Sequence, residues 1–544
     1  MRQEEMNKKL NPLAFWPALV ALSVFIFLGV FYQQQLGNFL NNLLYTMSDN
    51  LGWYLNLLSL LSLILVLVLA FGKTGNIKIG GADARPEFKT FNWCAMSICG
   101  GIGTGLLFWA MGEPIYHFAT PPIAAGVEPF SRGAGIFAVS QAMWDWSFIQ
   151  YAMYSLCAVA FALIAYNRKK SLSFGSIIER VCGRNIPWLN SIVHALIIFC
   201  LCGAVSNSMG VGLMQIGAGI QSVFGIAQSP MVWLIIAVVI GCIFILSCVS
   251  GIGTGLKKIS SVTIYIFIGL LIYVAIFGDT KFIGSISAEA VGDIIDNWGK
   301  KTMMLNTMVP EDTWSADWIL QYWASFIVYA PVIGMFLSRM AKGRTVRQFI
   351  MVNLLVPSLF CWVWIGIFGG MTIQLQSSGT IDVWKVVNEL GMQATIYQII
   401  NSLPMGGVIT VIFLVAVCFS FCTLADPMAS VLATLSVRKL SIEDEPPRNC
   451  KILMGIIIAA VSYLLVASGG VNSVKGMFVL IGLLISVILI LCVVAAFKLG
   501  SQCLKEKNDG VVDDEGPDLD LIETQKEKTA ENKPGNNIKN AVES

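Results

Sequence analysis

The sequence is dominated by long apolar runs that are nearly free of charged residues. A helix needs about 20 apolar residues to cross the roughly 30 Å core of a bilayer, and about twelve runs of the chain approach that length. Hydrophobic residues make up 56% of the 544 residues and charged residues only 12%, whereas about 25% of a soluble chain is charged. The chain is therefore predicted to be an all-α polytopic membrane protein. The predicted spans cover approximately residues 13–33, 53–72, 91–112, 134–166, 188–220, 229–250, 258–277, 314–338, 347–373, 404–435, 452–470 and 474–498.

Lysine and arginine gather in every second loop between these runs. Residues 73–90 and 167–187 carry several of them, whereas residues 34–52 and 221–228 carry none. Cytoplasmic loops of membrane proteins are enriched in lysine and arginine. The alternation therefore predicts a multi-pass protein of the plasma (inner) membrane, with an even number of spans and both termini in the cytoplasm.

The cysteines and the net charge do not indicate a metal site, a disulfide framework or a nucleic-acid partner. The 14 cysteines lie mostly within apolar runs and form no CxxC pair, which favours small buried hydrophobic side chains over a zinc site or a disulfide framework. A net charge of +2 does not indicate a nucleic-acid partner. The expected partners are the bilayer and a small-molecule substrate, and neither a cofactor nor a catalytic residue is expected.

Four glycines fall within six residues of the third predicted span, in the segment CGGIGTG at 99–105. Each glycine weakens a helix by about 1 kcal/mol relative to alanine, so this span is predicted to unwind. An unwound segment frees carbonyl groups to hold a cation and N–H groups to face an anion. Close packing of helices through small residues is the alternative interpretation.

Aromatic side chains recur near helical spacing in the eighth span, and others occur in the fourth. The eighth span contains Trp318, Tyr322, Trp323, Phe326 and Tyr329, and the fourth contains Trp144, Trp146, Tyr151 and Tyr154. Facing aromatic rings attract an ammonium group by about 0.5–2 kcal/mol each. The two sets therefore favour an aromatic box, with ordinary packing in the core or against lipid as the alternative.

Several segments resemble the betaine/carnitine/choline transporter family. The resemblance is strongest at YWA (322–324), GMFLSRM (334–340) and KGRTVR (342–347), with support from GIGTG (101–105), EP (113–114) and TLAD (423–426). It extends over about residues 13–498 and implies a LeuT-like core of two inverted five-helix repeats that assembles as a homotrimer.

The resemblance also implies a division of the chain. Its parts are a cytoplasmic N-terminus (1–12), two peripheral helices (13–90), a first repeat (91–277), an extracellular loop with an interfacial helix near 286–299 (278–313), a second repeat (314–498) and a disordered cytoplasmic tail (499–544).

The function implied by the resemblance is secondary active transport of a small methylated ammonium compound, such as betaine, carnitine or choline, by alternating access. The alternative is a carrier on the same fold for a less methylated amine or an amino acid, proton-coupled or exchanging. A membrane enzyme or channel would need a catalytic dyad or a ring of charges, and neither pattern is evident. A transport-like sensor would bind its ligand without flux.

The family's site residues can be carried over position by position. Its three aromatic positions in the eighth helix fall on Ser325, Phe326 and Tyr329, so one ring is lost and one tryptophan is replaced by phenylalanine. The complete predicted substrate set is Trp146, Tyr151, Tyr154, Tyr116, Trp323, Ser325, Phe326, Tyr329, Asp145, Gly101 and Gly103.

Asp145 is the most informative departure from the family, which places an uncharged residue or histidine there. An ionisable group within a span is costly and usually functional. Asp145 could bind a substrate amine that retains N–H groups, titrate as a proton-coupling group, or pair with a structural partner. His117, beside Tyr116, could line the outer vestibule.

The coupling ion is left open by the sequence. In sodium-driven members the third span and two tenth-span hydroxyls bind sodium, which maps to Cys99, Ile102, Ser420 and Thr423. Leu424 replaces the second hydroxyl, as in sodium-independent exchangers. Those exchangers carry an arginine in the seventh span, where this chain has Thr263. Sodium symport, exchange and proton coupling therefore all remain as alternatives.

Overall fold

The computed structural model describes residues 10–184, 186–251, 255–309, 311–437, 440, 442, 444–467 and 475–509. The long helices are α2 (Pro12–Phe31), α3 (Gln33–Phe71), α4 (Thr90–Ala119), α5 (Arg132–Asp145), α6 (Phe148–Ala162), α8 (Pro187–Phe224), α9 (Pro230–Ser250), α10 (Lys257–Phe277), α11 (Thr280–Met303), α12 (Gln321–Ser338), α13 (Val346–Ser377), α16 (Gly406–Leu435), α17 (Arg448–Ala467) and α18 (Lys475–Asp509). The shorter helices are α7 (Phe174–Cys182), α14 (Val383–Leu390) and α15 (Met392–Asn401), and one π-helical turn each follows α6 (Leu163–Asn167) and precedes α12 (Ala316–Leu320).

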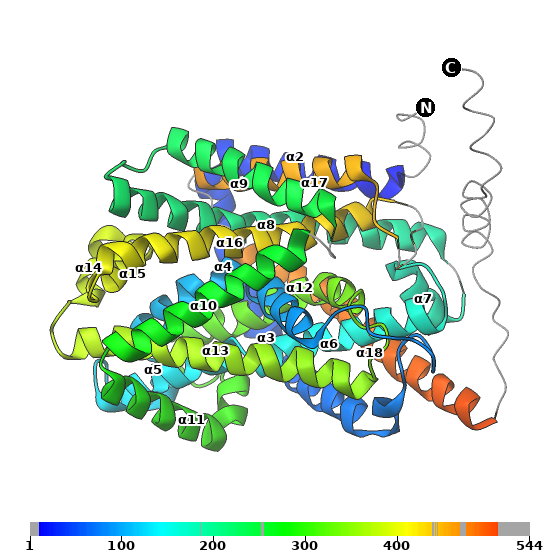
Figure 1. Ribbon diagram of the computed structural model, residues 1–544, viewed down its shortest axis with the longest axis horizontal. Helices are drawn as coiled ribbons and strands as arrows, with labels where there is room; N and C mark the ends of the chain where they lie inside the picture. Colours follow the sequence, from blue (N-terminus) through cyan, green and yellow to red (C-terminus); the bar gives the residue numbers. More distant parts are fainter. Residues whose placement is uncertain are drawn as a thin grey trace.

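Within the described residues, eleven helical segments are long and apolar enough to cross a membrane, and the bent helix α4 makes twelve. The spans run side by side along the long axis of the view in Figure 1, with α14 and α15 at one end of the bundle and α7 at the other. Among the described residues, β-structure is limited to two isolated bridges. The predicted all-α, polytopic fold class is confirmed.

The helix contacts repeat between two halves of the bundle. The first half contains α4, α5–α6, α8, α9 and α10, and the second contains α12, α13, α16, α17 and α18. Helix α4 packs on α13 as α12 packs on α6, and α9 packs on α16 as α17 packs on α8. Because each half has an odd number of spans, the second half crosses the membrane in the opposite direction, as in a LeuT-like inverted repeat.

Helix α4 bends sharply at the glycine segment, where the third span was predicted to break, although the backbone there stays helical rather than unwound. The parts of α4 before Gly101 and after Gly105 are inclined by 58°, while the backbone stays helical between them. A Cβ atom on Gly100 would lie 2.5 Å from Phe336 and one on Gly105 would lie 2.7 Å from Trp146. These two glycines therefore serve the close approach of bulky rings, which was the alternative interpretation.

The interrupted span is the fourth one, between α5 and α6. The backbone leaves the helix at Trp146 and Ser147, and Ser147 has φ −130° and ψ −123°. The Ser147 hydroxyl donates a hydrogen bond of 3.0 Å to the Trp144 carbonyl, which satisfies one of the groups freed by the break. The break thus places Trp146 at the junction of two helices.

Three segments are more helical than predicted. Helix α3 starts at Gln33 because its apolar stripe continues through the buried Leu40 and Leu44, so the loop predicted at 34–52 is wrong. Helix α11 extends beyond the predicted 286–299 and is capped by the Asp279 carboxylate, which accepts a hydrogen bond from the Phe282 amide.

Helix α18 continues past the predicted end of its span. The Arg168–Glu506 ion pair, at 2.5 Å, and a hydrogen bond from the Lys498 amine to the Val181 carbonyl fix its last turns to the bundle. The prediction of disorder is therefore wrong for residues 499–509, and residues 510–544 lie outside the described part of the chain.

Candidate substrate-binding cavity

A cavity of about 470 Å³ lies between α4 and α12, the first helices of the two halves. Helices α6, α8, α16 and α18 and the chain at the start of α15 complete its wall. Aromatic rings make up much of the lining. They belong to Phe108, Trp109, Tyr116, Trp146, Tyr154, Trp318, Tyr322, Phe326, Tyr329 and Phe478.

Three of these rings form a cage at the break in the fourth span. The ring centroids of Trp146 and Tyr322 are 5.5 Å apart, those of Tyr322 and Phe326 are 5.6 Å apart, and those of Trp146 and Phe326 are 6.2 Å apart. Tyr322 and Phe326 share one face of α12 because they are four residues apart. The Tyr322 and Phe326 rings are nearly parallel, at 13°, and the Trp146 ring meets them at 71° and 70°, so the three rings form one compact aromatic cluster in the cavity wall.

A second set of rings lies on the α4 and α12 turns next to the cage. Trp318 contacts Trp109 and Tyr116, with ring centroids 5.6 Å and 5.8 Å away. Tyr116 in turn meets Trp384 of α14 at 5.4 Å. This set extends the aromatic lining from the cage toward the end of the bundle that carries α14 and α15 (Figure 1).

No charged side chain lines the described part of the cavity wall. Its polar groups are amides and hydroxyls, contributed by Gln150, Asn207, Ser208, Gln321, Ser325 and Gln393. The Gln150 amide donates to the Gly101 carbonyl and to the Tyr154 hydroxyl, at 3.3 Å and 3.1 Å. The described lining can therefore bind a charged group only through aromatic rings, amides, hydroxyls and backbone groups, and not through an ion pair.

Seven of the predicted site residues meet in this cavity. They are Gly101, Tyr116, Trp146, Tyr154, Ser325, Phe326 and Tyr329. The Tyr329 hydroxyl donates a hydrogen bond of 2.8 Å to the Ala204 carbonyl of α8. Ser325 donates to the Tyr322 carbonyl at 3.0 Å, so its small side chain leaves room beside the cage.

Tyr151, Trp323 and Asp145 do not line the cavity. Tyr151 faces α13, where its hydroxyl lies 3.7 Å from the Cys361 sulfur. Trp323 donates from its indole to the Thr302 carbonyl at 3.2 Å, on the side of α11. Gly103 lies in the bent part of α4, and Asp145 is buried behind the cage.

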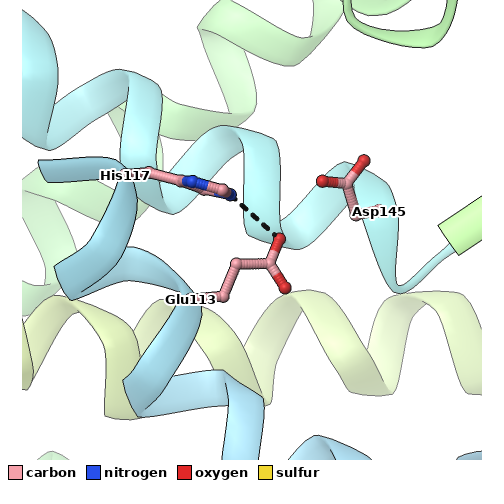
Figure 2. A group of neighbouring side chains, drawn as sticks. All are labelled: Glu113, His117 and Asp145. Atoms are coloured by element: carbon pink, nitrogen blue, oxygen red, sulfur yellow. Dashed lines mark hydrogen bonds and ion pairs between the residues drawn. The ribbon is translucent and has the colours of Figure 1, made fainter. Parts of the chain in front are cut away.

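Glu113 connects Asp145 to the cage. One oxygen of Glu113 accepts hydrogen bonds from the Trp146 indole, at 2.8 Å, and from the Tyr322 hydroxyl, at 2.6 Å. The other lies 3.3 Å from Nε2 of His117. Figure 2 shows one oxygen of Asp145 directed toward this pair, and all three side chains are fully buried. We call Glu113, His117 and Asp145 the Glu113 cluster.

The expectation that His117 lines an outer vestibule is therefore wrong. Its ring is enclosed by Trp314 and Trp318, with centroids 4.9 Å and 4.6 Å away. One helical turn separates His117 from Glu113, so both side chains lie on the same face of α4. The sequence spacing carried this signal, but only the packing of α5 and α12 shows that the face is buried.

The predicted sodium ligands belong to α4 and α16, two helices that pack against each other. The Thr423 hydroxyl donates a hydrogen bond of 2.9 Å to the Ser420 carbonyl. The Cys99 sulfur lies 3.6 Å from the Ser260 carbonyl of α10. Leu424, whose side chain has no atom that could bind sodium, faces the cavity. Sodium binding by Cys99, Ile102, Ser420 and Thr423 stays a prediction.

A bundle of paired repeats around a central, uncharged and ring-lined cavity defines a membrane carrier for small molecules. The family model described as BCCT, betaine/carnitine/choline family transporter, matches residues 13–503. The chain belongs to this family, and the resemblance noted in the sequence is confirmed. It is a transporter and not an enzyme.

Curated relatives agree with this assignment. The chain is 27% identical to a probable glycine betaine transporter of Desulfitobacterium hafniense (strain Y51), over 87% of this chain and 93% of the relative. It is 26% identical to an ectoine/hydroxyectoine transporter of Virgibacillus pantothenticus, over 89% and 96%. It is also 27% identical to the glycine betaine transporter OpuD of Bacillus subtilis (strain 168), over 89% and 93%.

Proposed function

We propose that this transporter carries a small zwitterionic methylated ammonium compound, with glycine betaine as the leading candidate. The ammonium end binds in the cage of Trp146, Tyr322 and Phe326, and alternating access exposes the cavity to each side of the membrane in turn. The observation that carries the proposal is the cage itself, three aromatic rings whose centroids lie within 6.2 Å of one another in a described lining without charged side chains.

The charge environment of the cage supports a cationic group. Each ring attracts an ammonium group by about 0.5–2 kcal/mol, more when the site excludes water. The Trp146 indole and Tyr322 hydroxyl both donate to the buried Glu113 carboxylate, which places negative charge directly behind two of the rings. A methylated ammonium group has no need of hydrogen-bond acceptors, so the rings satisfy it fully.

The carboxylate end of a zwitterion would meet the amide donors of the lining. Asn207 of α8 and Gln393 of α15 line the cavity, and amide N–H groups are suitable donors to a carboxylate. The absence of lysine and arginine from the described lining favours a ligand without net charge over an organic anion. Ser325 stands at a position where the family has an aromatic ring in the eighth helix. Its small side chain widens the cavity beside the ammonium group.

The setting of the transporter in its membrane is part of the proposal. The alternation of basic loops supports a plasma membrane location with both termini in the cytoplasm. The homotrimer follows from family membership alone, and cross-linking in native membranes would test it. Sodium at the α4–α16 contact is the first coupling ion to examine, because Ser420 and Thr423 present oxygen atoms there.

Uptake into proteoliposomes tests the proposed function. Purified protein should accumulate labelled glycine betaine, and carnitine, choline, dimethylglycine and ectoine should be compared at equal concentrations with and without a sodium gradient. Lack of both binding and flux for every methylated compound would overturn the proposal. Binding without flux would identify a sensor.

A matched pair of variants locates the substrate. Phe326→Leu removes one π-face while keeping a side chain of similar size, and it should raise the Kd for glycine betaine about 2- to 30-fold. Phe421→Leu makes the same change at a buried position of α16 outside the cavity and should leave the Kd unchanged. Equal effects of the two variants would place the ammonium group elsewhere.

A further inference from the structure

The Glu113 cluster contains two carboxylates and an imidazole packed together in the interior of the bundle. A carboxylate oxygen of Glu113, a ring nitrogen of His117 and a carboxylate oxygen of Asp145 all lie within 4.8 Å of one another. Each of the three side chains is fully buried (Figure 2). Two carboxylates this close in a site of low polarity cannot both remain ionised unless a cation offsets their repulsion.

Hydrogen bonds inside the cluster are incomplete. One oxygen of Asp145 accepts from the Gln141 amide at 2.9 Å, while the other oxygen has no partner among the described residues. Nδ1 of His117 is likewise without a partner there. A buried carboxylate oxygen that faces a second carboxylate and an imidazole is suited to share a proton with them.

The surroundings supply little positive charge to the cluster. The titratable groups that face it are Tyr322 of α12 and, from α11, Lys301. Lys301 lies 2.8 Å from the Asp293 carboxylate and 4.6 Å from the centre of the Phe137 ring. Since Lys301 is already paired, neutralisation of one carboxylate of the cluster falls to a proton.

The cluster also shares its negative charge with the cage. One oxygen of the Glu113 carboxylate accepts hydrogen bonds from Trp146 and Tyr322, and the other oxygen faces His117. Both oxygens share the negative charge of the same carboxylate. An ammonium group held against those two rings is attracted by the same carboxylate that a proton would neutralise. Occupancy of the cage by a cation therefore weakens the hold of the cluster on its proton.

We propose that Glu113, His117 and Asp145 form a proton-binding site whose proton leaves when the ammonium group of the substrate enters the cage. In this step the O–H bond of one carboxylic acid breaks, the electron pair stays on the carboxylate, and the proton passes to solvent. This inference rests on the proposed function, since it requires a cationic group in the cage. It makes proton and substrate competitors for one negative charge.

Competition between the proton and the substrate fixes the direction in which substrate affinity changes with pH. Substrate affinity should rise with pH by up to tenfold per unit across the range in which the cluster titrates. Binding should release up to one proton for each substrate bound, and release should be greatest at pH values where the empty site is protonated and the occupied site is not. Substrate symport with a proton bound at this cluster requires the opposite sign.

Proton release can be measured directly on the full-length protein. Glycine betaine is added to purified transporter in weak buffer containing a pH-indicator dye, at intervals from pH 5 to pH 9, and calorimetric titrations at the same pH in two buffers of different ionisation enthalpy give the number of protons per binding event. We expect release with wild-type protein. Proton uptake, or binding with no proton change at any pH, would overturn the inference while leaving the proposed function intact.

Two variants, each of which replaces one carboxylate by an amide, test whether the released proton comes from the cluster. Asp145→Asn should remove the pH dependence of Kd and the proton release. Glu289→Gln removes a carboxylate at the surface of α11 and should retain both. Proton release by Asp145→Asn equal to that of wild type would overturn the assignment, and if this variant does not fold, the wild-type measurement decides. If glycine betaine, carnitine and choline all fail to bind, the proposed function falls and this inference with it.

Discussion

The contact between Gly105 and Trp146 holds the cage in shape, and Gly105→Ala tests it. A Cβ atom at position 105 would lie 2.7 Å from the Cη2 atom of Trp146, whereas carbon atoms in contact are normally 3.5–4.0 Å apart. The indole must therefore move by about 1 Å. Its Nε1 atom, now 2.8 Å from Glu113, would then leave the range of a hydrogen bond, which ends near 3.2 Å.

The expected magnitude follows from that lost bond. A hydrogen bond to a charged group contributes about 1.5–3 kcal/mol, so Gly105→Ala should raise the Kd for glycine betaine about 10- to 150-fold if binding needs the intact cage. Calorimetric titration of protein that elutes as a single species measures this. Gly269→Ala is the control, because a Cβ atom on that helical glycine meets nothing within 4 Å.

A double-mutant cycle separates the clash from a general loss of packing. Trp146→Phe removes the outer edge of the indole that the new methyl group would strike. Gly105→Ala should therefore cost much less affinity in the Trp146→Phe background, with a coupling energy of at least about 1 kcal/mol. Wild-type affinity in Gly105→Ala, or an equal loss in both backgrounds, would refute the reasoning.

Two further predictions concern the Asp293–Lys301 pair of α11 and the predicted sodium ligand Thr423 of α16. Burial alone would raise the pKa of Asp293 in α11, but the charge of Lys301 and hydrogen bonds from neighbouring side chains hold the pKa below its usual value. The stabilisation is thus present above about pH 4 and is lost as the pH falls through the lowered pKa, so Tm should decline less steeply from pH 5 to pH 3 in Asp293→Asn than in wild type. If sodium binds at the α4–α16 contact, Thr423→Val should raise the sodium concentration for half-maximal uptake several-fold, whereas Thr410→Val on the same helix should not. Unchanged sodium dependence in Thr423→Val would remove that site.

The sequence was sufficient for the span count and the class of protein. Apolar runs of membrane length and the alternation of basic loops are local signals, and the structure has twelve candidate spans when the bent α4 is included. The ends of α3 and α18 were placed wrongly because polar residues in those segments also suit loops. Only tertiary contacts, such as the Arg168–Glu506 pair, keep them helical.

The cage was predicted in part, because ring type and spacing do not give the rotation of a helix. Trp323 and Tyr322 are neighbours in the aromatic stripe, yet Trp323 faces α11 and Tyr322 faces the cavity. Tyr151 was misplaced for the same reason. The break at Trp146 and Ser147 left no glycine or proline signal, since it depends on how α5 and α6 pack against α4 and α12.

Glu113 was recognised as part of a motif but not as a neighbour of Asp145. The two residues lie 32 positions apart in the chain and meet only through the packing of α5 on α4. No periodic pattern encodes such a meeting. Asp145, which was predicted among the substrate residues, lies beside Glu113 and His117 and not among the residues that line the cavity.

The uncharged lining of the cavity has an electrical consequence. Moving one elementary charge through 100 mV changes the free energy by about 2.3 kcal/mol. Since no described lining side chain is charged, the walls of the cavity carry no fixed charge through the field when access alternates. A zwitterion moving alone would be electrically silent, and choline would carry one positive charge. Current recorded with glycine betaine on a solid-supported membrane therefore measures the charge of the coupling ion together with that of any proton released by the Glu113 cluster.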